Sequence, residues 1–170
     1  MIKTQIVLLI ATHKHKNMRS KTTTWFECKV RYEQMQENGN QKMVAEQYVV
    51  DAQSFTEAEN RLMEAMESYI SGEFEVAEIK KAPYREVFFM EDEVLKSGTD
   101  EIKFYKAKLA FITIDEKTEK EKRNNVYYLC QACSLHNALD NIDAVMTGTM
   151  FEYIQASVSE TQILEVYEHS

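Results

Sequence analysis

The feature that most constrains the fold is an internal repeat. Residues 48–79 read YVVDAQSFTEAENRLMEAMESYISGEFEVAEI, and a blurred copy follows about 79 residues later at 127–158, YYLCQACSLHNALDNIDAVMTGTMFEYIQASV. Self-similarity over such a length indicates one supersecondary unit that occurs twice. The chain is therefore expected to form two similar lobes.

The first copy predicts a capped helix between two strands. Ser54 can accept from the amide of Glu57, and Glu57 can reach back to the amide of Ser54, which is a capping box. Apolar residues then recur at helical spacing, and Gly72 is expected to end the helix as a left-handed cap. These apolar positions are Phe55, Ala58, Leu62, Ala65, Met66 and Tyr69. The flanking segments alternate and are rich in Val and aromatic residues, which is typical of strands.

The second copy repeats this pattern with a weaker cap. Ser134 takes the place of Ser54, but Asn137 stands where a Glu would complete the capping box. The repeat also extends upstream, because residues 26–32 and 105–111 both alternate between apolar and polar side chains. Each half is thus expected to begin with a β-hairpin.

The turns and the last strands differ between the halves. Asn38-Gly39 is a strong hairpin signal, whereas the second turn, DEKTEKEKRNN, is a charged run without tight-turn chemistry. The last strand of the first half runs from about Glu73 to Phe89 and is interrupted at Ala82-Pro83, because proline donates no ladder hydrogen bond. Whether each last strand is one kinked strand or two stays open.

These patterns predict an α+β protein built as a tandem duplication of a β-β-α-β unit. The sheet is expected to be mainly antiparallel, with one helix in each unit and a pseudo-twofold axis between the units. The predicted division is an N-terminal extension at 1–23, a first unit at 24–89, an acidic linker at 90–101 and a second unit at 102–170. Because one helix covers a small sheet poorly, the two units are expected to bury a joint apolar interior.

Residues 1–23 differ from the rest of the chain. They carry five basic residues and no acidic ones, with a single apolar run from Ile6 to Ala11. That run is too short to span a bilayer and does not resemble a usual signal peptide. The segment is interpreted as a disordered tail or a mis-called start, with Met18 as the alternative first residue. A strand at Gln5–Ala11 added to a sheet edge is the other interpretation.

Charge and cysteine content narrow the class of protein. The chain carries a net charge of −8, and 15 basic against 28 acidic residues remain from Thr24 onward, which gives −13. Such a body repels phosphate backbones and disfavours nucleic-acid binding. Three cysteines without an export signal predict reduced thiols and a cytoplasmic location.

A possible metal site is the sharpest local motif. Cys130, Cys133 and His136 have a spacing that occurs in zinc sites, and Cys28 could supply a fourth ligand. The alternative is that the cysteines are core or helix-flanking residues, and the repeat favours it because Val50–Thr56 holds no Cys or His. We expect no metal, no cofactor and no catalytic site, since no phosphate-binding loop or nucleophile motif occurs.

Trp25, Lys29, Phe104 and Lys108 form the candidate binding face. They occupy matching places in the two halves and alternate with the presumed core residues. An aromatic beside a basic residue on an exposed strand face suits stacking of single-stranded nucleic acid, and it also suits a protein–protein surface. The other interpretation is pairing of the lysines with neighbouring Glu and burial of the aromatics.

The stretches WFECKVRYE, EQYVVDAQSFTEAE, SGEFEVAEIKKAPYREVF and ASVSETQILEVY resemble a family described only as a domain of unknown function. The resemblance spans about Trp25 to Tyr167. It implies a source among gut bacteria of the Bacteroides group and their phages. It implies no activity, no cofactor and no catalytic residues, and the cysteine pair is not part of its pattern.

The expected function is that of a small non-enzymatic binding or adaptor protein. It would act through sheet-edge or aromatic-face contacts on an unknown protein partner, a homodimer being one option, and without a membrane. Two alternatives stay open: a single-stranded nucleic-acid accessory protein in phage or mobile-element biology, and an enzyme of unrecognised class.

Overall fold

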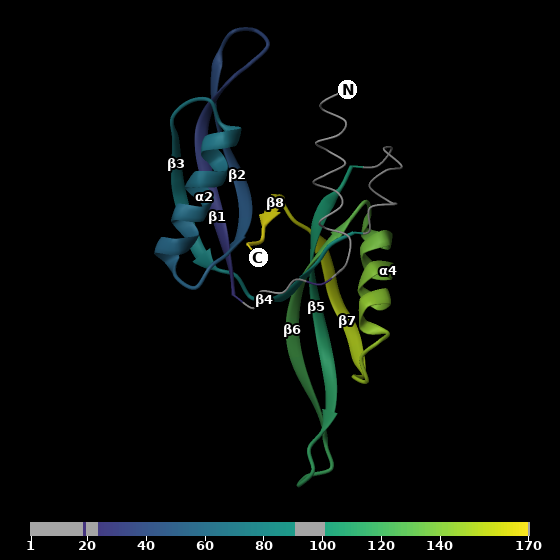
Figure 1. Ribbon diagram of the computed structural model, residues 1–170. Helices are drawn as coiled ribbons and strands as arrows, with labels where there is room; N and C mark the ends of the chain where they lie inside the picture. The colour runs from purple at the N-terminus through teal and green to yellow at the C-terminus, as the bar shows by residue number, and fades with distance from the viewer. Residues whose placement is uncertain (1–18, 20–23, 91–100, 170) are drawn as a thin grey trace. The chain divides into compact units, whose positions relative to one another are not determined.

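The computed structural model describes Arg19, residues 24–90 and residues 101–169 (Figure 1). Each half contains four strands and one helix within these residues. The first half holds β1 (Trp25–Met35), β2 (Gln41–Asp51), α2 (Phe55–Tyr69), β3 (Phe74–Lys81) and β4 (Tyr84–Phe88). The second half holds β5 (Lys103–Ile114), β6 (Glu121–Ala132), α4 (Leu135–Met146), β7 (Tyr153–Glu160) and β8 (Ile163–Tyr167). The expected α+β fold with a duplicated β-β-α-β pattern is confirmed.

The two halves exchange their last strands. One four-stranded sheet has the order β3-β1-β2-β8 and the other has the order β4-β6-β5-β7. The short strand that ends each half of the sequence therefore completes the sheet of the other half. The chain divides into two compact units accordingly: a first unit of residues 24–85 and 162–169, and a second unit of residues 86–161 with Arg19.

Both sheets are mixed. In the first unit β1 pairs antiparallel with β2 and with β3, whereas β8 runs parallel to β2. In the second unit β5 pairs antiparallel with β6 and with β7. The pairing register shifts between Lys29 and Val30 in β1 and between Lys108 and Leu109 in β5. These irregularities occupy matching places, so the duplication extends to details of register.

The connection from β3 to β4 is too short to carry β4 to the far edge of its own sheet, beside β2. Only Ala82 and Pro83 separate the two strands, so the connection spans at most about 11 Å. The place beside β2 lies three strand spacings from β3, or about 14 Å. Residues Thr161 and Gln162 impose the same limit on β7 and β8. The interrupted last strand is thus two strands in each half, and proline is not the general cause, because only the first half contains one.

Matching hydrogen bonds hold the exchanged strands. Just beyond β8, the amide of His169 donates to Oδ1 of Asp51 at 3.0 Å. Just beyond β4, the amide of Met90 donates to Oε1 of Gln131, also at 3.0 Å. Asp51 and Gln131 stand at the same place of the repeat, as do Met90 and His169. The same exchange is therefore secured twice with chemically different side chains.

Aromatic contacts at the exchanged strands also occur in both units. The ring centroids of Tyr48 and Tyr167 lie 5.9 Å apart, and those of Tyr128 and Phe88 lie 4.9 Å apart. Each pair joins the second strand of a hairpin to the strand received from the other half. Such pairs contribute about 0.5–1.5 kcal/mol beyond the area that they bury.

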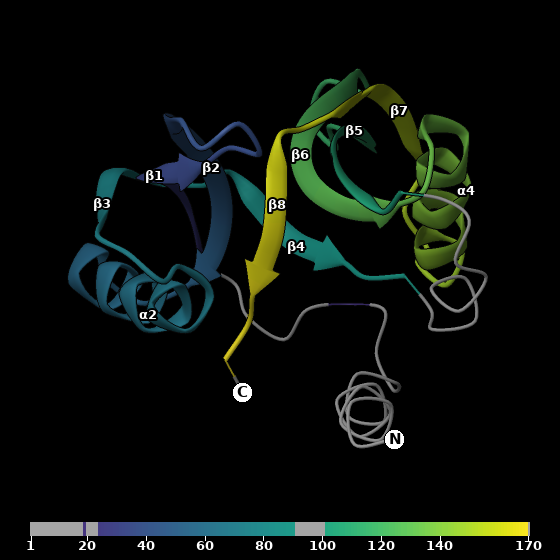
Figure 2. The ribbon, with the colours of Figure 1, turned by 90° about the horizontal axis from the view of Figure 1, so that it is seen from above.

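Each helix packs on one face of its own sheet (Figure 2). The first core lies between α2 and the β1–β2–β3 face, and Leu62 and Met66 are fully buried in it. The second core lies between α4 and its sheet and includes Ile142 and Met146. Burial of a Leu, Ile or Met side chain contributes about 1.5–3 kcal/mol.

Ser54 and Ser134 are helix N-caps as expected, but two details differ. Oε2 of Glu57 accepts from the amide of Gln53 instead of Ser54, and Asn137 accepts from the amide of Cys133, so both capping boxes close one residue earlier. The expected left-handed cap at Gly72 is wrong, because α2 ends at Ile70 in an extended conformation. Gly39 does have positive φ, at 81°, as the hairpin turn requires.

Most of the N-terminal extension and of the linker at 90–101 lies outside the described residues. Arg19 is described, and it forms an isolated antiparallel bridge with Phe88. Its Nε donates to Oε2 of Glu86 at 2.7 Å, and this hydrogen bond raises the pKa of Arg19.

Candidate binding surface

The predicted aromatic and basic face is not an exposed platform. Trp25 is 0% exposed and Phe104 is 2% exposed, so the expectation that these rings face solvent is wrong. The indole Nε1 of Trp25 is buried and has no hydrogen-bond partner among the described residues. Both faces of β1 and β5 carry buried side chains, which alternation of apolar and polar residues alone does not reveal.

The lysines of that face are half-buried in the strands. Nζ of Lys29 lies 3.4 Å from Oε2 of Glu78 on β3. This is the cross-strand pairing that the sequence offered as the alternative. Lys108 takes the matching place in β5 and is also half-buried. A binding role for the two lysines stays a prediction.

The candidate metal ligands are dispersed. Cys28 belongs to the core of the first unit, and Cys130 to the core of the second. Burial raises the pKa of each thiol to about 12. Cys133 is half-buried, and the imidazole of exposed His136 lies 3.8 Å from Asp140 one helical turn away. Among the described residues no three or more His, Cys, Asp or Glu side chains gather where they could hold a metal ion.

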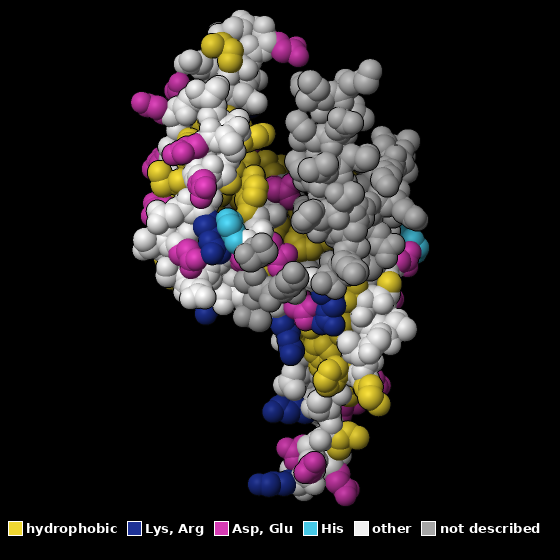
Figure 3. Space-filling model, in the orientation of Figure 1, with side chains coloured by type: hydrophobic (Ala, Val, Ile, Leu, Met, Phe, Trp, Pro, Cys, Tyr) yellow, Lys and Arg dark blue, Asp and Glu magenta, His cyan; other side chains and the backbone are white. Residues whose placement is uncertain are grey.

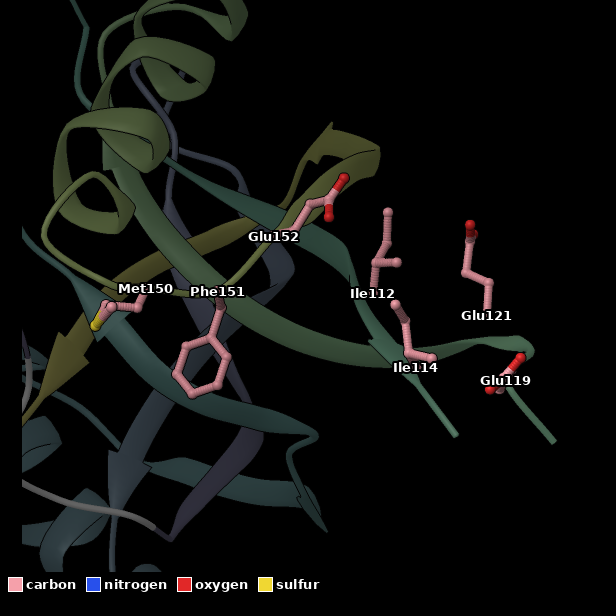
Figure 4. A pocket seen from close by; sticks show the side chains of 7 residues that line it. All are labelled: Ile112, Ile114, Glu119, Glu121, Met150, Phe151 and Glu152. Carbon is pink, nitrogen blue, oxygen red and sulfur yellow. The ribbon is translucent and has the colours of Figure 1, made fainter. Parts of the chain in front are cut away.

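An open hollow lies in the second unit, where the β5–β6 hairpin meets the loop before β7 (Figure 4). Its volume is about 450 Å³, and apolar and acidic side chains line it. The lining residues are Ile112, Ile114, Glu119, Glu121, Met150, Phe151 and Glu152. We call the hollow that these residues line the apolar–acidic hollow. No lysine or arginine is among the lining residues.

The hairpin side of the hollow is held by an organised turn. Oδ1 of Asp115 accepts from the amides of Lys117 and Thr118 at 2.9 and 3.0 Å, and these bonds lower the pKa of Asp115. Glu119 adopts positive φ, 54°, and its amide donates to the carbonyl of Asp115. The expectation of a turn without tight-turn chemistry is therefore wrong, since an Asp side chain replaces the usual glycine signal.

The loop side of the hollow is fixed at both ends. The hydroxyl of Thr149 donates to the carbonyl of Met146 at 2.7 Å, which ties the loop to the end of α4. The carbonyl of Glu152 accepts from the amide of Ile112 at 2.9 Å, which joins the loop to β5. The ring of Phe151 meets that of Phe111 edge-on at 5.7 Å. The loop thus presents its apolar side chains from a defined position.

Large apolar side chains of this region face solvent. Met150 is fully exposed, Phe151 is 65% exposed, and Ile114 is also exposed. Figure 3 shows apolar side chains along the lower part of the second unit, above charged side chains at the hairpin tip. Contiguous exposed apolar side chains mark interaction sites more often than scattered ones do.

The repeat supplies an internal comparison for these residues. Counted back from β3 and β7, Ser71 and Gly72 of the first unit stand where Met150 and Phe151 stand in the second. The first unit joins its helix to the next strand through four residues instead of six, and that connection includes those small residues. A helix-to-strand connection of this kind therefore forms without the apolar pair. In the sequence, Met150 and Phe151 are marked only by their difference from the first copy, because neither helical nor strand periodicity includes them.

The strand next to the hollow is an edge strand. β7 pairs with β5 on one side and ends the sheet order of the second unit. Its residues 153–159, YIQASVS, carry no charge. β3, at the matching edge of the first unit, reads FEVAEIKK. Its charges are paired in part, since Nζ of Lys80 lies 3.4 Å from Oε2 of Glu27 on β1.

A second, smaller depression of about 40 Å³ lies on the β1–β3 side of the first unit. Its walls are Glu27, Cys28, Lys29, Gln47, Glu78 and Lys80. Lys29 and Lys80 form ion pairs at this depression, so these charged groups are already paired with one another. No helix among the described residues is long and apolar enough to cross a membrane.

Comparison with known proteins assigns a family. The family model described as "Domain of unknown function (DUF4494)" matches residues 24–169. Curated proteins give no match to the chain, and solved structures give none either. The match begins where the first hairpin begins and covers both units. The chain therefore belongs to the DUF4494 family.

Proposed function

We propose that this chain is a non-enzymatic binding protein whose apolar–acidic hollow receives a protein partner. The observation that carries the proposal is the exposed pair Met150 and Phe151, which has small residues as its counterpart in the shorter helix-to-strand connection of the first unit. Exposed Phe and Met side chains are favoured anchors of protein interfaces. Burial of each would contribute about 1.5–3 kcal/mol to binding.

The lining of the hollow indicates the chemistry of the partner segment. Apolar side chains would cover Met150 and Phe151, and basic side chains would face Glu119 and Glu152. The body of the protein reinforces this preference, because a net charge of −8 attracts cationic segments and repels acidic ones. The proposal places the partner in the cytoplasm of a Bacteroides-type gut bacterium or of a cell infected by its phage, the sources that the sequence resemblance implies.

The nucleic-acid alternative has no observation in its favour. Its stacking platform required the rings of Trp25 and Phe104 to be accessible, and both are buried. We therefore carry a single candidate function forward.

The test compares two matched variants with the natural chain. Met150→Glu with Phe151→Glu places like charge in the hollow. Met35→Glu with Met43→Glu makes the same change at the first hairpin, where the two side chains are 64% and 59% exposed. Each tagged chain is cross-linked in host-cell extract, and the proteins retained are quantified by mass spectrometry. Any protein lost selectively is then purified and titrated calorimetrically with all three chains.

The proposal expects at least about a tenfold loss of affinity for the hollow variant, which corresponds to about 1.4 kcal/mol, and natural affinity for the hairpin control. Equal affinity of all three purified chains for the captured protein would contradict the proposal. Absence of any protein that distinguishes the hollow variant from the control would contradict it as well.

A further inference from the structure

We propose that β7 is a docking edge for a second copy of this chain, with the two β7 strands pairing antiparallel about a twofold axis. The inference goes beyond the proposed function, because it concerns the edge strand beside the hollow and a contact between two copies of the chain. The occupant would extend the four-stranded sheet into a continuous eight-stranded one.

β7 has few of the charged side chains that protect a sheet edge. Folded proteins protect exposed sheet edges with charges, lysines, proline, bulges or cover, because a row of free backbone groups pairs with other strands. The pairing of β3 and that of β7 both contain a bulge at matching places, so charge is what distinguishes the two edges. β3 carries four such charges, whereas β7 carries one, Glu160, which lies 2.7 Å from Nζ of Lys103, although the two strands have the same place in the repeat. The residues of β3 are Glu75, Glu78, Lys80 and Lys81, and those at the matching places of β7 are Ile154, Ser157, Ser159 and Glu160.

Three uncharged side chains of β7 share one face of the sheet. Ser157 and Ser159 stand opposite Lys108 and Lys106 of β5, and Ile154 stands opposite Ala110. Because opposed residues of antiparallel strands lie on one face, these three β7 side chains lie on the same face. The register shift beside Lys108 makes this possible, since Ile154 and Ser159 would otherwise alternate. All three are exposed, Ile154 to 41%.

The sequence of β7 is compatible with antiparallel pairing to β7 of a second copy. Antiparallel pairing about the midpoint between Ala156 and Ser157 places Ile154 opposite Ser159 of the second copy. The same register places Tyr153 opposite Glu160, and Glu152 opposite Thr161. No two like charges meet. Outside the bulged residue Ala156, which has no partner on β5, each opposed pair comes from one face, as a twofold axis perpendicular to the sheet requires. An isologous contact of this kind closes as a dimer and does not propagate.

The charge of the body sets the salt dependence. Two chains of −8 repel each other at long range, so added salt should tighten the dimer by screening that repulsion. A dimer held together by ion pairs between the two copies would instead become weaker as salt is added.

The test uses charge swapping across the proposed axis. Ile154→Glu with Ser159→Glu places like charges opposite each other in the dimer, and Ile154→Lys with Ser159→Lys does the same with the other sign. Each variant alone is expected to dimerise at least about tenfold more weakly than the natural chain in sedimentation equilibrium between about 1 and 300 μM. An equimolar mixture of the two should associate again, because the carboxylates introduced in one chain would then face the ammonium groups introduced in the other. Restored association also shows that both variants are folded.

Two further full-length variants separate the other occupants. Thr56→Glu with Ser68→Glu adds the same two charges to the exposed side of α2 and should leave the dimer intact. Val7→Asp with Leu9→Asp disrupts the apolar run of the N-terminal segment and should also leave it intact. Loss of the dimer in the N-terminal variant would overturn the inference and make that segment the occupant.

The remaining outcomes also decide the matter. A natural chain that stays monomeric at every concentration overturns the inference, and so does a mixture of the Glu and Lys variants that fails to associate. Either result leaves the proposed function standing if capture of a host protein still depends on Met150 and Phe151. Loss of the dimer on Met150→Glu with Phe151→Glu, with the β7 variants unaffected, would place the contact between copies at the hollow instead and overturn the β7 pairing.

Discussion

Cys28 and Cys130 illustrate how position decides the behaviour of a residue in this chain. Both thiols point into helix–sheet cores, and Sγ of Cys130 lies 3.9 Å from the carbonyl of Ala138 on α4. Burial disfavours the thiolate and raises the pKa of each to about 12. At neutral pH both side chains are therefore neutral groups of the two cores.

Thiol labelling tests this description. Treatment of the native chain with an aromatic disulfide reagent at pH 8 should modify Cys133 quickly, while Cys28 and Cys130 react only through unfolding. The change Cys133→Ser should abolish the fast phase, and urea should expose the two remaining thiols. Fast modification of Cys28 or Cys130 in the folded Cys133→Ser chain would show that the cores are more open than described.

The residues that the sequence identified best are those whose role is local. Ser54 and Ser134 could be identified as caps because capping depends on the next three residues only. Trp25 and Phe104 were misplaced, because alternation shows which side chains share a face but not whether the opposite face is also covered. Met150 and Phe151 were missed because neither helical nor strand periodicity includes them.

At the scale of elements, the exchanged strands β4 and β8 are fixed by side chains at the ends of β6 and β2. Asp51 is buried, and its Oδ1 accepts from the amide and Nδ1 of His169 and from Arg61 at 3.2 Å. Gln131, at the matching place, accepts from the amide of Met90 without any ionic partner. The first unit therefore holds its received strand through charge-assisted hydrogen bonds, and the second through a neutral one.

Substitution of Asp51 and of Gln131 should show how much each residue contributes to stability. Asp51→Ala removes several partly buried hydrogen bonds and should lower the free energy of unfolding by about 2–3 kcal/mol, allowing for the partial exposure of Arg61 and His169. Gln131→Ala should cost about 1 kcal/mol. Urea unfolding followed by Trp25 fluorescence and circular dichroism measures both values.

The matched control for this pair is Glu59→Ala on the exposed side of α2, which is expected to change stability by less than about 0.5 kcal/mol. Equal costs for Asp51→Ala and Gln131→Ala would argue against the ionic description of the first unit. A cost near that of the control for both would show that these hydrogen bonds do not fix the exchanged strands.

At the scale of the whole molecule, the duplication could be predicted and the exchange could not. The helices, the hairpins and their order follow from capping and periodicity, which the sequence displays directly. The sequence does not show which sheet β4 and β8 join. The edges of β2 and β6 are copies of each other, so either edge could pair with either strand. The two-residue connections at Ala82-Pro83 and at Thr161-Gln162 exclude only the far edge of the strand's own sheet. That limit can be derived only once the sheet order is known, and the sequence does not state it.

The reciprocal exchange is the central claim, and the neighbour of β8 in solution tests it most directly. In an isotopically labelled chain, nuclear Overhauser contacts should join Val166 to Val49 of β2, its partner in the parallel register. Without exchange β8 would lie beside β6 of its own half, and Val166 would contact Leu129, the residue that matches Val49. Contacts from Val166 to Val49 are the predicted result, and contacts from Val166 to Leu129 would contradict the account.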